Sequence, residues 1–234
     1  MSLTSALSIA QSALLNTSRQ TTVVSRNVSE ANNPDYTRRS AVLVTTAGGA
    51  KVGQIQRATN DVLFRQNLSA ISSFTAQSTL MGSMDSLSLS VNGSDNAPSA
   101  ATLLGKFQQA LQTFSASPSN GTVAESAIEA ARQLVSGLNS ASQQIQSFRA
   151  DQDSQIKTAV GELNSLLSDF EKANREIVAG TKLGRDVNDA LDQRDALLKK
   201  ISELVPISAI PRPNNDLMLV TTSGATLFET QPRA

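Results

Sequence analysis

The sequence contains neither cysteine nor histidine among its 234 residues. The first absence excludes disulfides and thiolate chemistry, and the second removes the commonest general base and the commonest metal ligand. Carboxylate, lysine or serine chemistry remains, but no pair of acids has a supporting context, so a carboxylate hydrolase is the least favoured alternative. We expect a protein that is not an enzyme and that holds no cofactor or metal.

Aromatic residues are scarce, and neither charge is in excess. Aromatics make up 3% of the chain and tryptophan is absent, so a core must be built from Leu, Ile, Val and Ala. Basic and acidic residues number 20 each, and the densest basic runs are Arg38-Arg39 and Lys199-Lys200. This balance does not indicate a nucleic acid or an anionic membrane as a partner. The composition favours helices packed on helices.

Long hydrophobic runs are lacking as well. No apolar stretch approaches the roughly 18 residues that a membrane-spanning helix needs, and the first positive side chain is Arg19. We therefore expect neither a membrane span nor a cleaved Sec signal. A cytosolic home does not follow, because some secretion machines read an uncleaved N-terminus.

A helix is predicted from about residue 2 or 4 to about residue 29, with a stripe of residues that recur at alternating steps of four and three. This stripe, the assembly seam, consists of Leu3, Leu7, Ala10, Leu14, Thr17, Thr21, Val24 and Val28. Burying its large members contributes about 10 kcal/mol, whereas ordering about 26 residues costs about 1.5 kcal/mol each. We predict that this segment is disordered alone and helical only when a partner covers the seam.

Residues 25–40, SRNVSEANNPDYTRRS, form a joint between this helix and an extended segment. Asn32, Asn33 and Pro34 end the helix, because the residue before proline avoids the α region and Asn favours turns. Tyr36, the only tyrosine, either packs its ring against the helix end or makes a fixed contact that sets the helix angle; both can hold. Residues 41–55 are rich in β-branched side chains around Gly48-Gly49, which predicts an extended arm or a loose hairpin with little core.

Four further helices are predicted, at about 56–90, 99–114, 127–179 and 186–204, separated by turn-rich segments that include GTKLG at 180–184. On the first of them, Leu63, Ala70, Phe74, Met81 and Met84 lie near one apolar face, with the methionines as core filler. On the longest, Gly137 and Gly161 mark close helix approaches or bends.

Residues 206–234 change to a strand pattern with a hairpin turn at Ser223-Gly224. We expect a mainly α fold: a long-helix bundle with an N-terminal coiled-coil helix, an extended arm and the start of a C-terminal β domain. The corresponding segments are 1–55, 56–205 and 206–234. Because a lone hairpin is marginal in water, the chain looks cut short at this sheet.

The helix at 186–204 carries aspartates every three residues, which could be offered as a metal cluster. Because a helix has about 3.6 residues per turn, residues spaced by three do not stay on one face, and basic residues are their neighbours. A solvated, salt-bridged face is therefore favoured over a metal cluster. This interpretation turns one set of residues inward, Val187, Leu191, Leu198, Ile201 and Val205. It turns another outward, Asp192, Arg194, Asp195, Lys199 and Lys200.

The joint resembles that of flagellar rod, hook and hook-associated proteins, whose pattern is close to S-N-N-I-A-N-x-N-T-P-G-Y-[ST]-R-Q. The chain matches it at Ser25, Asn27, Val28, Asn32, Pro34, Tyr36, Thr37 and Arg38, and departs from it at Arg26, Glu30, Asn33, Asp35 and Arg39. Asp35 replaces a glycine, which favours a type I turn over type II. The sequence ALDQRDALLKKISELV resembles a second signature, the L-D-Q-R-D-x-L-[LV] helix of the FlgK-type hook-associated family. Its residues are Leu191, Asp192, Gln193, Arg194, Asp195, Leu197 and Leu198.

The resemblance implies a structural component of the hook-filament junction, outside the cell, exported unfolded by the flagellar type III apparatus. The implied partners are copies of the chain itself, the hook protein and a second junction protein; no nucleic acid, membrane or small-molecule substrate is implied. In the family the N-terminal helix pairs with a C-terminal one, which we do not find in this sequence. Two alternatives remain: another flagellar axial protein, since rod and hook proteins share the joint, and an intracellular coiled-coil scaffold or signalling module, suggested by the longest helix.

Overall fold

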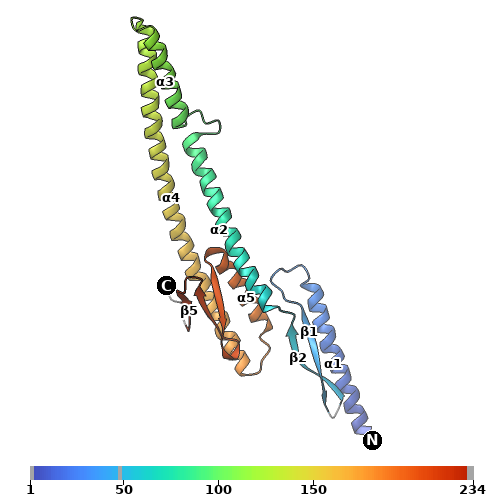
Figure 1. The fold of residues 1–234 in the computed structure, drawn as a ribbon. Coiled ribbons are helices and arrows are strands. Elements are labelled where there is room, and N and C mark those ends of the chain that lie inside the picture. The colour runs from blue at the N-terminus through green and yellow to red at the C-terminus, as the bar shows by residue number, and fades with distance from the viewer. Residues whose placement is uncertain (1–2, 47–48, 231–234) are drawn as a thin grey trace. The chain divides into compact units, whose positions relative to one another are not determined.

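The computed structural model describes residues 3–46 and 49–230 (Figure 1). Its helices are α1 (Leu3–Ser29), α2 (Asp61–Asn92), α3 (Ala100–Ala116), α4 (Gly121–Lys182), α5 (Asn188–Leu204) and a short 3-10 turn η1 (Pro213–Asn215). Its strands are β1 (Arg39–Thr46), β2 (Gly49–Arg57), β3 (Ile207–Pro211), β4 (Leu217–Thr221) and β5 (Thr226–Phe228). The mainly α class and the long helix are thus confirmed.

Two compact units make up the chain, one formed by Met1–Phe74 with Glu162–Ala234 and the other by Thr75–Gly161. The boundaries differ from the predicted segments 1–55, 56–205 and 206–234. The difference arises because α2 and α4 each contribute to both units, and because the N-terminal segment shares a unit with α5 and the C-terminal sheet. In the described part of the chain, no helix has the length and apolar character required to cross a membrane.

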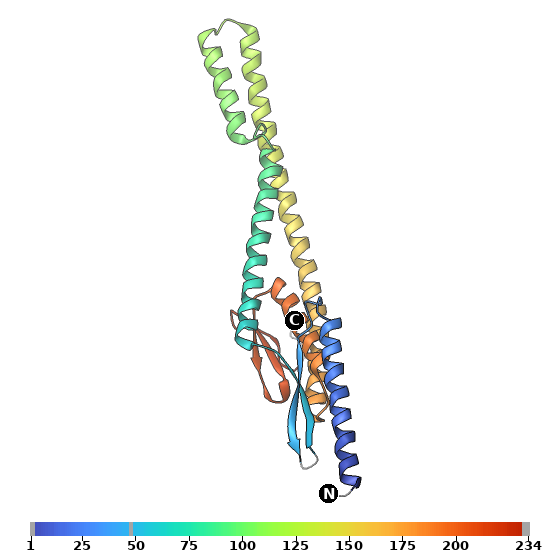
Figure 2. The ribbon, with the colours of Figure 1, turned by 90° about the vertical axis from the view of Figure 1, so that its right-hand side faces the viewer.

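The core of the first unit lies where α4 and α5 meet the C-terminal sheet (Figure 2). Phe170 of α4 meets Phe228 of β5 edge to face, with ring centroids 5.0 Å apart, an arrangement that aromatic pairs prefer. The sheet is antiparallel in the order β3-β4-β5. The predicted hairpin at Ser223-Gly224 is therefore not alone, because a third strand, which the sequence pattern did not reveal, and two helices cover it. The buried core residues are Leu68, Leu167, Phe170, Ala173, Leu197, Leu198, Ile201, Ile207, Leu219 and Phe228.

Helix α2 differs from its prediction in both its start and its buried face. Strand β2 continues to Arg57, and α2 begins only at Asp61, where the Asn60 side chain accepts a hydrogen bond from the Leu63 N–H at 3.0 Å. The predicted core positions Leu63, Phe74, Met81 and Met84 are exposed, whereas Leu68 and Ser72 are buried. The prediction was wrong because apolar residues occur all round this helix, so their spacing does not select one face.

Helices α3 and α4 lie side by side in the second unit (Figure 1). Ser99 caps α3 by accepting a hydrogen bond from the Thr102 N–H. At Gly137 the helices approach so closely that an added Cβ would lie 2.1 Å from Cδ1 of Leu103, whereas the space at Gly161 is open. The close approach predicted at Gly137 is therefore confirmed, and the one at Gly161 is not.

The end of α4 follows the GTKLG signal. Gly184 has a φ of +65°, and the N–H groups of Arg185 and Gly184 donate to the carbonyls of Gly180 and Thr181. These paired bonds form the Schellman motif that satisfies the last carbonyls of a helix. The chain then turns directly into α5.

Candidate functional site: the N-terminal helix and its joint

The assembly seam of α1 is exposed along its whole length. All eight of its residues are exposed, and each of its large apolar members, Leu3, Leu7, Leu14, Val24 and Val28, is at least 60% exposed. A row of apolar side chains at coiled-coil spacing is therefore presented to the surroundings.

A different face of α1 packs against the β1–β2 hairpin, which lies alongside the helix in both ribbon views (Figures 1 and 2). Asn16 and Val23 are buried there, with Gln20 and Asn27 half-buried. At about 100° per residue this hairpin face lies roughly a third of a turn from the seam. Asn16 holds β2 from both sides of its amide: its Nδ2 donates to the Ala50 carbonyl and its Oδ1 accepts the Val52 N–H at 2.9 Å. Residues 41–55 thus belong to a hairpin and not to a single extended arm, and sequence reasoning missed Asn16. The prediction that the segment is helical only when a partner covers the seam was wrong, because the hairpin packs on another face of α1 and the helix forms with its seam exposed.

Asn27 ties the end of α1 to the start of β1. Its Nδ2 donates to the Arg39 carbonyl at 2.8 Å, and its Oδ1 accepts the Arg39 N–H at 2.9 Å and the Tyr36 hydroxyl at 2.8 Å. The Arg39 guanidinium lies over the Tyr36 ring, 5.0 Å from its centroid. Tyr36 thus both packs at the helix end and makes a fixed polar contact.

The turn before Tyr36 is closed by its N–H, which donates to the Asn33 carbonyl at 3.2 Å. Asp35 does not have a positive φ, which excludes a type II turn and agrees with the expected preference of Asp. The Asp35 carboxylate accepts a hydrogen bond from Lys199 of α5 at 3.0 Å, and Thr37 accepts one from Arg57 at 3.1 Å. Other members of the family motif lie on the surface, namely Ser25, Asn32, Pro34 and Arg38.

An ion-pair cluster joins the joint and the hairpin base to α5. It comprises Arg26, Arg39, Arg57, Asp189, Asp192 and Asp195. Asp192 contacts Arg39 and Arg57 at 2.8 Å each, Asp189 contacts Arg26 and Arg39, and Asp195 contacts Arg57. The Asn188 side chain adds a hydrogen bond to the Ile55 carbonyl at 3.0 Å. The second signature helix is therefore the surface on which the N-terminal segment is held.

The expectation of a solvated charged face on α5 was wrong for Asp192 and Arg194, which are buried. Of the signature residues, Leu197 and Leu198 are also buried, Leu191 and Asp195 are half-buried, and Gln193 is exposed. Arg194 donates to Asn174 at 2.9 Å and to the Asn215 carbonyl, and burial lowers its pKa to about 10. The amphipathic pattern failed here because charged side chains can be buried when groups from elsewhere in the chain pair with them, as for Asp192, or accept their hydrogen bonds, as for Arg194.

Two of the aspartates have shifted pKa values. Burial acts to raise the pKa of Asp189, but hydrogen bonds from Arg39 and Arg26 outweigh it and hold that pKa below its usual value. Burial raises the pKa of Asp195 above its usual value, against the opposing charge of Arg57. Among the described residues, no group of three or more acidic side chains is placed to hold a metal ion; the aspartates of α5 have arginines as partners instead.

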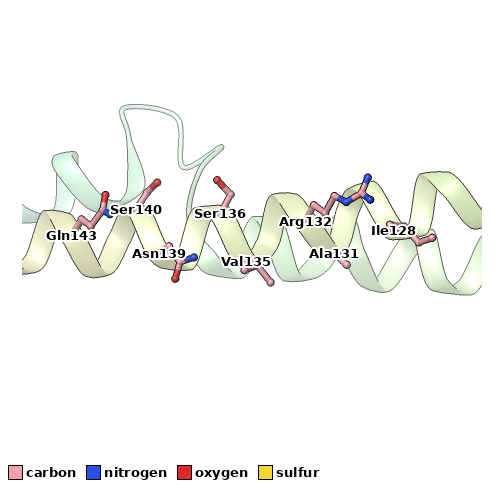
Figure 3. A pocket seen from close by; sticks show the side chains of 8 residues that line it. All are labelled: Ile128, Ala131, Arg132, Val135, Ser136, Asn139, Ser140 and Gln143. Carbon is pink, nitrogen blue, oxygen red and sulfur yellow. The ribbon is translucent and has the colours of Figure 1, made fainter.

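The surface of α4 carries a hollow, whose lining side chains are shown in Figure 3. Its lining consists of Ile128, Ala131, Arg132, Val135, Ser136, Asn139, Ser140 and Gln143. These side chains offer apolar and uncharged polar surface with one arginine, and no carboxylate is among them. This hollow gives no support to the hydrolase alternative.

Comparison with known proteins agrees with the resemblance in the joint and in α5. Residues 84–232 match the family model described as the flagellar hook-associated protein FlgK helical domain. Flagellar hook-associated protein 1 of Salmonella typhimurium is 27% identical over 96% of this chain, which covers 41% of that protein; its Bacillus subtilis counterpart is 23% identical, with 96% and 46% covered. The structure of the flagellar hook junction protein FlgK from Burkholderia pseudomallei superposes with a TM-score of 0.62 at 26% identity, over 71% of this chain and 29% of that one.

The fold and these matches define the class as structural proteins of the bacterial flagellum. Within that class, the chain belongs to the FlgK family of hook-associated proteins, because the family model covers more than half of its length. The chain spans roughly two fifths of the length of the Salmonella relative.

Proposed function

We propose that this chain is a structural component of the hook-filament junction, in which the assembly seam of α1 is covered by a helix of the assembled flagellum. The observation that carries the proposal is the exposure of the whole seam while a neighbouring face of the same helix is held by the hairpin. A helix that is fixed in place and yet leaves an apolar stripe uncovered is suited to a helical partner.

The partners proposed are further copies of the chain and its axial neighbours, the hook protein and a second junction protein. Delivery is proposed to occur through the flagellar type III apparatus, without a cleaved Sec signal, to a site outside the cell. Family membership supports this proposal.

The direct test is deletion of the gene. The null strain is expected to retain hooks but lack filaments, and to release flagellin monomers into the medium; a plasmid copy should restore filaments. Normal filaments in the null strain would refute the proposal.

A further inference from the structure

Two arginines stand directly opposite each other at the base of the β1–β2 hairpin. Arg39 and Arg57 are partners in the strand register, and their side chains are only 4% and 9% exposed. Like charges opposite one another on adjacent strands destabilise a sheet, and burial strengthens the repulsion because water no longer screens it. The hairpin base therefore depends on an anion from outside the hairpin.

That anion is Asp192, and each of its two carboxylate oxygens forms an ion pair with one of the arginines. Oδ2 lies 2.8 Å from Nη2 of Arg39, and Oδ1 lies 2.8 Å from Nη2 of Arg57. Asp189 also contacts Arg39, and Asp195 also contacts Arg57. All three carboxylates belong to α5, so the charge that the hairpin needs comes from a helix more than 130 positions later in the chain.

The same contacts reach the seam through the joint. Arg39, which Asp192 neutralises, exchanges two backbone hydrogen bonds with the side chain of Asn27. Asn27 lies in the last turns of α1, next to the seam residue Val28. The position of the end of α1 is thus connected to Asp192 by a short series of contacts.

We infer that Asp192 is a positioning residue: by neutralising the opposed Arg39 and Arg57, it makes the docking of α1 and the hairpin, and hence the direction of the seam, depend on a folded α5. The docking itself stands on the geometry alone, whereas its importance for assembly rests on the proposed function. An N-terminal segment that docks only after α5 has formed presents its apolar seam only on a folded subunit.

The test compares three variants of this chain by amide hydrogen exchange. Asp192→Asn leaves two buried cations without their shared anion, and hairpin amides such as that of Val52 should exchange on the order of a hundredfold faster, with α4 and α5 amides unchanged. Arg57→Gln alone should have a small effect. The double variant Asp192→Asn with Arg57→Gln removes the repulsion and should exchange more slowly at the hairpin than Asp192→Asn.

A double variant that exchanges as fast as Asp192→Asn, or faster, would overturn the inference, because simple loss of contacts predicts that order. Unchanged hairpin exchange in Asp192→Asn would overturn it too. If Asp192→Asn also loses core protection, the double variant decides: a recovered core and hairpin support the inference, and loss of both in the two variants contradicts it.

Filament counts in cells separate this inference from the proposed function. Asp192→Asn should reduce filaments and the added Arg57→Gln should restore them. Restored hairpin protection together with normal filaments in the null strain would leave the positioning role standing and remove the assembly role.

Discussion

Two faces of α1 have the same helical spacing and opposite chemistry. The seam is largely apolar and exposed, whereas the hairpin face presents Asn16, Gln20, Val23 and Asn27 and is covered. The face that the chain uses for its own folding is thus the more polar one, attached by two asparagines that bond to strand backbone. The apolar face is left uncovered by the described residues.

The largest effect on filament assembly is expected from a substitution in the seam. Leu14→Asp places a charge on a 71% exposed apolar position, so filament assembly should be abolished because the charge would be buried against the partner helix. The free energy of unfolding of the isolated chain should change by less than about 0.5 kcal/mol. Filaments are counted by microscopy, and unfolding is followed by urea titration.

The matched control is Leu15→Asp, the same change at a 57% exposed leucine on the third face of α1, with no seam or hairpin-face position three or four residues away. It introduces the same residue into the same helix and should leave filaments normal. Equal loss of filaments in the two variants would show that the seam has no special role.

The hairpin face should respond in the opposite way. Asn27→Ala removes three hydrogen bonds, to Tyr36 and to both backbone groups of Arg39, and should cost about 2 to 3 kcal/mol in the docking of the hairpin. Faster exchange of the β1 amides measures this loss. Asn32→Ala, at an exposed asparagine of the same joint, should stay within about 0.5 kcal/mol; similar losses in both variants would contradict the account.

Tyr36→Phe tests a single one of these hydrogen bonds and should destabilise the docking of the hairpin less than Asn27→Ala does. It deletes the hydroxyl that donates to Asn27 and keeps the ring beneath Arg39, so a loss of about 1 kcal/mol is expected in the same exchange measurement. Tyr36→Ala should cost more, because the ring contact goes as well. A loss for Tyr36→Phe as large as that for Tyr36→Ala would give the ring no part in the joint.

The smallest effect expected is a pH dependence of opposite sign at two aspartates of α5. The folded pKa of Asp189 is lowered, so the stability it contributes is complete above the ordinary value of 3.8 and is lost as pH falls below it. The folded pKa of Asp195 is raised, so its charge opposes folding, and stability rises as pH falls toward 3.8. Stability is measured by urea titration at pH values below and above 3.8 for the parent, Asp189→Asn and Asp195→Asn. The stability difference between variant and parent should change with pH in opposite directions for the two variants; a change in the same direction would contradict the assignment.

Features governed by local signals could be predicted from the sequence. The end of α1 was predicted from Asn33 and Pro34, and the end of α4 from the glycine-containing segment that includes Gly184. The seam was predicted from the regular spacing of Leu and Val. These signals act over a few residues, so no tertiary contact is needed to read them.

The contacts that hold the joint could not be predicted in this way. Arg26 and Asp189 are 163 positions apart, and Arg57 and Asp195 are 138 apart. The amphipathic pattern assigned Asp192 to solvent, because charge alone does not reveal that two arginines of the hairpin lie beside it. Asn16 carried a weak signal, since asparagine is a poor residue for a helix interior and here recurs in step with Val23 and Asn27.

The most direct test of the account asks whether the seam is covered in the assembled flagellum. The chain has no native cysteine, so Leu14→Cys and Leu15→Cys each introduce a single thiol for maleimide labelling. Both thiols should react in the free protein, and only the one at position 15 should react in purified flagella. Equal labelling of both positions in flagella would contradict the central claim that the seam of α1 is the face that assembly covers.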